Sequence, residues 1–111
     1  MSLLDLLPMT APDVEANATP AERAEAFHKA NPKVYYELRR LAMQLVRVGH
    51  RKFGIAMIFE QLRWQWYERT QDIEGFKLNN SYRAFYARLL MESEPELAGV
   101  FETRRTTEKE T

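Results

Sequence analysis

The residues with the clearest capacity for chemistry in this sequence are polar groups near its carboxyl-terminal third. Asn80, Arg83 and Arg88 fall on one side of a predicted helix, with Ala84 and Ala87 between them. Arginine and asparagine make the paired hydrogen bonds that distinguish guanine and adenine, and small residues let a helix enter a groove closely. The pattern predicts a helix that contacts DNA bases. Alanine and arginine also cover ordinary solvated helix faces, and that alternative stays open.

Basic residues elsewhere would contact the phosphates on either side of this helix. They are Arg51, Lys52, Lys77, Arg104 and Arg105. Arg51 and Lys52 form a cluster with Arg47 and His50, near the end of another predicted helix. Positive charge is favourable at the carboxyl end of a helix, so Arg47 also has an explanation that needs no ligand.

The distribution of charge along the chain supports a polyanion as partner. Residues 1–31 carry two basic and five acidic side chains, a net of −3, and residues 92–111 carry three and six, again −3. Residues 32–91 carry eleven basic and five acidic side chains, a net of +6. A cationic centre of this kind attracts nucleic acid.

Nothing in the sequence predicts an enzyme, a cofactor or a metal site. The two histidines, His28 and His50, lack metal-ligand spacing, and the serines have no neighbouring base. The four glycines form no phosphate-binding loop, and cysteine is absent, which excludes disulfides and thiolate ligands. No apolar run approaches the roughly 20 residues that span a bilayer. We therefore expect a non-enzymatic cytoplasmic protein.

Apolar periodicity predicts a mainly α-helical domain over residues 20–104, between a flexible segment (1–19) and a disordered tail (105–111). A short helix follows Thr19 and Pro20, which suit a cap and a first turn, and stops at Asn31-Pro32. Three main helices follow, at about residues 32–48, 54–69 and 80–91, with Gly49 ending the first of them.

Short alternating segments at residues 76–78 and 100–103 predict a two-stranded β element beside the last helix. Together these features indicate a winged helix-turn-helix-like fold. One spacing disagrees, because about ten residues separate the last two helices where a helix-turn-helix has about three or four.

A second interpretation is a protein-interaction module. The third helix carries Met57 and Trp64 away from its main apolar face. A helix that is apolar on more than one side is either buried at the centre of the domain or leaves an exposed apolar surface to which other molecules bind. This surface, or the leucines at residues 3–7, would bind a host protein or a second copy. Aromatic residues at helical spacing beside leucine and isoleucine are more often core, so an exposed Trp64 would favour this interpretation and a buried one would not.

Several segments are similar to small uncharacterised helical proteins encoded by bacteriophages and prophages. They are Phe27 with Asn31-Pro32 and Val34-Tyr35, then Arg63-Trp64, residues 76–82 (FKLNNSY) and Tyr86-Ala87-Arg88. The resemblance covers roughly residues 24–104. It implies a compact helical domain acting in the host cytoplasm, as a DNA-binding or regulatory protein or as a ligand of a host factor, and it implies no reaction.

Overall fold

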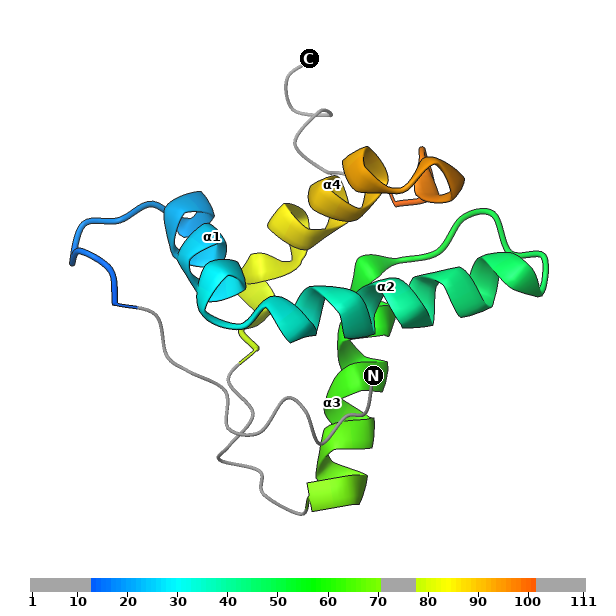
Figure 1. Cartoon of the computed structure of the whole chain (residues 1–111), viewed down its shortest axis with the longest axis horizontal. Helices are drawn as coiled ribbons and strands as arrows, with labels where there is room; N and C mark the ends of the chain where they lie inside the picture. The colour runs from blue at the N-terminus through cyan, green and yellow to red at the C-terminus, as the bar shows by residue number, and fades with distance from the viewer. Residues whose placement is uncertain (1–12, 71–77, 102–111) are drawn as a thin grey trace.

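The computed structural model describes residues 13–70 and 78–101. The described chain forms four α-helices: α1 (Pro20–Ala30), α2 (Pro32–Arg47), α3 (Ile55–Thr70) and α4 (Arg83–Ser93). Two 3-10 turns, η3 (Asn80–Tyr82) and η4 (Pro95–Leu97), flank α4. Figure 1 shows α1 beside the start of α4, while α2 passes below both and α3 leads away from α2. The prediction of a mainly α-helical domain is confirmed.

Local signals set the ends of the helices where the sequence indicated. The Thr19 hydroxyl accepts a hydrogen bond from the backbone N–H of Glu22, whose carboxylate accepts one from the N–H of Thr19, so α1 starts with a capping box. Pro32 stands in the first turn of α2. Gly49, just after α2, has φ of +104°, a left-handed conformation that L side chains rarely adopt. At the other end of the domain, the Asn79 side chain accepts from the N–H of Ser81 and starts η3.

The core lies where all four helices meet, and α3 supplies its largest fully buried side chain, Trp66. Trp66, Phe59 and Leu62 on α3 are fully buried. They pack in one cluster with buried apolar residues of the other helices and of η3 and η4: Ala24, Phe27, Val34, Leu38, Leu41, Tyr82, Tyr86, Ala87, Leu90 and Leu97. A position at the middle of the domain, expected from the apolar character of this helix, holds for one face only, because Met57 and Trp64 on the other side are exposed.

The strand prediction is wrong for the residues that the structure describes. Leu78 has no regular structure, Val100 lies in a turn and Phe101 in a bend. All three side chains are buried in the helical core, which explains the apolar alternation without a sheet. The remaining residues of the two predicted strands lie outside the described ranges. No described residue belongs to a strand, so the described part of the chain contains no wing.

The inner face of α4 is turned relative to the prediction. The helical spacing of its apolar residues predicts an inner face of Tyr82, Phe85, Tyr86, Leu89 and Leu90. Tyr82, Tyr86 and Leu90 are buried, but Phe85 and Leu89 are only half-buried. Ala87, predicted on the outer face, is 1% exposed and belongs to the core. Helix periodicity defines an apolar arc, whereas the contacts with α1, α3 and η4 decide which part of that arc is covered.

One buried carboxylate joins α2 to α3. Glu37 is 1% exposed and accepts two hydrogen bonds from Arg40, at 3.0 and 2.8 Å. Arg40 also donates to the side-chain oxygen of Gln65 on α3. A buried charge needs such a partner, because an unpaired one is strongly destabilising. A second ion pair, between Arg39 of α2 and Glu94 at the end of α4, has an N–O distance of 2.7 Å.

His28 is a titratable group surrounded by aromatic rings. Its ring centroid lies 5.7 Å from that of Tyr35, 6.0 Å from Phe85 and 5.8 Å from Tyr86. The His28 Nδ1 atom is buried and has no hydrogen-bond partner among the described residues. Burial lowers the pKa of His28 below its ordinary value, and the nearby Glu25 carboxylate opposes that change in part.

We expect the stability of the domain to fall in mild acid because of His28. The unfolded chain takes up this proton near pH 6.5, whereas the folded protein takes it up only at lower pH. The stability that comes from keeping His28 neutral is therefore fully present above pH 6.5. It is lost as the pH falls toward the lower pKa of His28 in the folded state. Denaturant unfolding between pH 7.5 and 5 should show wild type losing stability relative to His28→Phe, which keeps the ring but cannot titrate. Equal pH dependence of the two proteins would contradict this role.

Candidate functional site

Helix α3 has two opposite faces of different character. Its buried face carries Phe59, Leu62 and Trp66. Met57, Gln61, Trp64 and Glu68 are all exposed and lie within an arc of about 60°, at about 100° per residue, on the other side. We call these four residues the outer face of α3.

The outer face exposes two large apolar side chains. Trp64 is 61% exposed and Met57 is 49% exposed. The two residues are seven positions apart, which is about two helical turns. Single exposed apolar residues are common on soluble proteins, whereas contiguous exposed apolar patches often mark interaction sites. Trp66, two residues further along, is fully buried, so only one of the two tryptophans is available to a partner.

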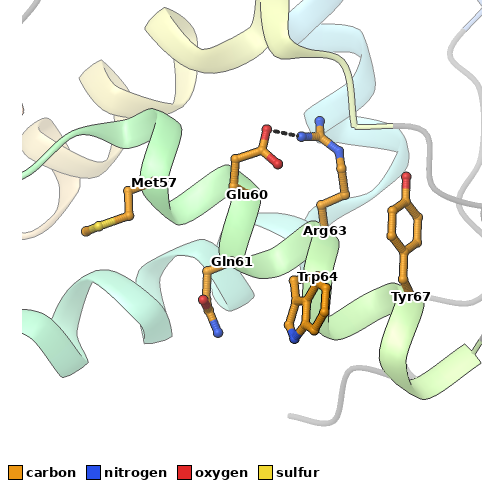
Figure 2. Close-up of a pocket in the computed structure, with 6 residues that line it drawn as sticks. All are labelled: Met57, Glu60, Gln61, Arg63, Trp64 and Tyr67. Atoms are coloured by element: carbon orange, nitrogen blue, oxygen red, sulfur yellow. Dashed lines mark hydrogen bonds and ion pairs between the residues drawn. The ribbon is translucent and has the colours of Figure 1, made fainter.

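A shallow hollow of about 370 Å³ adjoins the outer face. It is lined by Met57, Glu60, Gln61, Arg63, Trp64 and Tyr67. Figure 2 shows Gln61 and Trp64 pointing to one side of the helix, while Glu60 and Arg63 point to the other and pair. Polar groups therefore border Met57 and Trp64 on one side, and Gln61 lies between them. A polar rim around apolar side chains is the usual arrangement of a protein-binding surface.

Arg63 holds this border in place. Besides its pairing with Glu60, it donates to the backbone carbonyl of Leu78 at 3.1 Å and to the side-chain oxygen of Asn80 at 3.0 Å. These bonds tie α3 to the segment that leads into α4. The border is thus pre-organised, which lowers the entropy lost when a partner binds.

A second hollow of about 210 Å³ lies between α2 and α3. Leu41, Gln44 and Leu45 line it from α2, and Met57, Ile58, Gln61 and Gln65 line it from α3. Met57 and Gln61 line both hollows. The apolar area around Met57 therefore extends from Trp64 across to α2.

The predicted base-contacting residues are brought together only in part. Asn80, Ala84 and Arg88 are exposed, Arg83 is half-buried, and Ala87 is in the core, so Ala87 cannot contact a groove. The Arg83 Nε–H donates to the backbone carbonyl of Asn80 at 3.1 Å. The Asn80 side-chain oxygen accepts from Arg63.

Helix geometry also limits the outward face of α4. Ala84, Arg88 and the exposed Glu92 follow one another at intervals of four residues. An acidic group thus follows the arginine on the face that was predicted to approach DNA, and it repels phosphate.

The other predicted phosphate contacts lie toward the opposite end of α4. Arg51 and Lys52 are exposed in the link between α2 and α3. The next residue, Phe53, donates its N–H to the carbonyl of Val100 and packs edge-on against Phe101, 5.5 Å between ring centroids. The link is therefore attached beyond the end of α4, whereas Asn80 stands before its start (Figure 1).

Lys77, Arg104 and Arg105 lie outside the described residues. No group of three or more acidic or histidine side chains among the described residues could hold a metal ion. None of the described helices is long and apolar enough to cross a membrane. The expectation that the chain is not an enzyme stays a prediction.

Sequence reasoning singled out Met57 and Trp64 but missed Gln61 and Glu68 as members of the same face. The signal was present in the intervals of four, three and four residues that join Met57, Gln61, Trp64 and Glu68. A search for apolar periodicity does not detect this face, because two of its four members, Gln61 and Glu68, are polar.

The chain matches no known protein family, no curated protein and no solved structure. The resemblance to bacteriophage and prophage proteins therefore stays a prediction.

We expect Trp64 to contribute little to folding, in contrast to Trp66. Trp64→Ala should change the free energy of unfolding by no more than about 0.5 kcal/mol, since it removes an exposed side chain. Trp66→Ala should cost about 3–5 kcal/mol, since it leaves a large cavity in the core. Urea denaturation of both variants and of wild type, at a protein concentration low enough for the chain to be monomeric, measures the difference. A loss of several kcal/mol in Trp64→Ala would show that this ring packs in the fold.

Proposed function

We propose that this protein is a helical protein-interaction module that binds its partner through the outer face of α3. The observation that carries the proposal is the exposure of Trp64 beside Met57, opposite the buried face of the same helix. An exposed tryptophan was the outcome that favours this interpretation over core packing.

The energetics of these side chains support a binding role. Burying a large apolar side chain releases about 1.5–3 kcal/mol relative to leaving it in water. Tryptophan is among the residues that most often dominate interface affinity, particularly when less exposed contacts surround it. Trp64 and Met57 stand on a helix whose other side is anchored in the core, so binding a partner does not require ordering of their backbone.

A site-specific photocrosslink tests this proposal. The chain with p-benzoylphenylalanine in place of Trp64 should form covalent adducts with protein on irradiation in cells, because the probe lies inside the interface. The adducts should weaken when Met57→Glu is added, since a charge then enters the apolar centre of the surface. Gel mobility and mass spectrometry identify the adducts.

The matched control places the same probe at Tyr36, an exposed aromatic residue of α2 that is not on the outer face of α3. Equal adducts at positions 36 and 64 would indicate random collision. An absence of protein adducts at position 64 would refute the interaction module.

Duplex DNA binding is a second candidate, as a non-enzymatic DNA-binding or regulatory protein. Exposed Asn80, Ala84 and Arg88 on α4 support it, together with Arg51 and Lys52. We place it second because Ala87 is buried, Glu92 follows Arg88 on the outward face, and the two basic groups lie toward opposite ends of α4.

Measuring affinity for duplex DNA at several salt concentrations tests the DNA-binding function. With about four to six phosphate contacts, the logarithm of the association constant should fall against the logarithm of salt concentration with a slope of about −4 to −5. Arg88→Ala should reduce that slope by about 1 if Arg88 contacts a phosphate. Glu25→Ala, on α1, serves as control. Lack of binding at low salt, or affinity independent of salt, would refute DNA binding.

A further inference from the structure

We propose that the occupant of the outer face of α3 is a second copy of this chain, packed with its α3 antiparallel about a two-fold axis at Gln61. The inference rests on the proposed interaction function and names its partner. It is argued from the order of apolar and charged residues along one exposed face.

The apolar residues of the outer face are self-complementary in this arrangement. Met57 stands about one helical turn before Gln61, and Trp64 stands about one turn after it. Rotation by 180° about an axis at Gln61 therefore places Met57 of each copy against Trp64 of the other. The exposed indole then covers the apolar area around Met57, where the two hollows meet. An isologous interface requires this reciprocity.

The charges at the two ends of α3 are complementary in the same arrangement. Exposed Glu68 lies seven residues after Gln61, and the exposed basic residues Arg51 and Lys52 lie ten and nine residues before it, in the link that leads into α3. No ion pair is formed by Glu68, Arg51 or Lys52 within residues 13–70 and 78–101. Antiparallel pairing brings each Glu68 to the Arg51 and Lys52 of the other copy.

A parallel pair of α3 helices would reverse this result. Glu68 would face Glu68, and Lys52 would face Lys52, so like charges would repel at both ends. The axis residue also suits the antiparallel pair, because a glutamine side chain is both donor and acceptor and can bond reciprocally with its own copy. The chain has a formal net charge of zero, so its copies have little long-range repulsion.

Charge reversal and rescue test the antiparallel register. Sedimentation equilibrium of the full chain at low ionic strength should show a dimer. Glu68→Lys and Lys52→Glu should each weaken dimerisation by about tenfold, because the pair occurs twice and attraction becomes repulsion. The double variant should return to within about threefold of wild type. Trp64→Ala should weaken the dimer by at least about thirtyfold.

An engineered disulfide tests the position of the axis. Helices in contact are about 8–10 Å apart, so Cα atoms facing each other at the axis approach to about 5 Å, within reach of a disulfide. The chain has no cysteine, so Gln61→Cys gives a single thiol. Mild oxidation should convert it to a covalent dimer, and adding Trp64→Ala should prevent this. Ala84→Cys, exposed on α4, should form no covalent dimer under the same oxidation.

Each outcome separates this inference from the proposed function. A chain that stays monomeric to several hundred micromolar, while the probe at position 64 crosslinks a different protein, would overturn self-association and leave the interaction module standing. A monomer without any adduct would overturn both. A dimer that the double charge reversal does not rescue, or that Gln61→Cys does not crosslink, would overturn the antiparallel arrangement. Circular dichroism of each variant confirms that loss of the dimer is not loss of folding.

Discussion

The burial of one face of α3 is the constraint on which the rest of the structure depends. Phe59, Leu62 and Trp66 fill the space between α2 and α4, and Trp66 is the largest fully buried side chain of the described residues. An α-helix turns by about 100° per residue, so fixing these three residues inward also fixes the opposite residues outward. Met57 and Trp64 are exposed as a direct consequence, because the described chain places no helix over that side.

Polar contacts determine how rigidly this surface is presented. The buried Glu37 carboxylate is held by Arg40, which also reaches Gln65, and so joins α2 to α3 on one side of the outer face. Arg63 joins α3 to the segment before α4 on the other side. These bonds are tertiary, since each couples residues from different elements, and together they hold the apolar surface between two fixed borders.

The two candidate functions require different surfaces from the fold. DNA binding needs cationic groups from several elements to form one continuous surface, and the described basic residues lie toward both ends of α4, with Glu92 on its outward face. A protein interface needs a rigid apolar centre with a polar border, and α3 alone supplies most of it. The second requirement is met by residues close in sequence, which explains why the sequence already indicated Met57 and Trp64.

The sequence by itself determined the helices and most of their ends, because capping boxes, proline at a first turn and glycine after a last turn act through neighbouring residues. Thr19, Pro32 and Gly49 are such cases. Tertiary structure alone decided which part of each apolar arc is covered, since this depends on elements distant along the chain. In the folded chain Ala87 is buried, and Trp64 is exposed although Trp66 is buried. Val100 and Phe101 lie in the helical core, where alternation had predicted a strand. Burial is a property of the assembled surfaces, and periodicity restricts it without choosing among neighbouring positions.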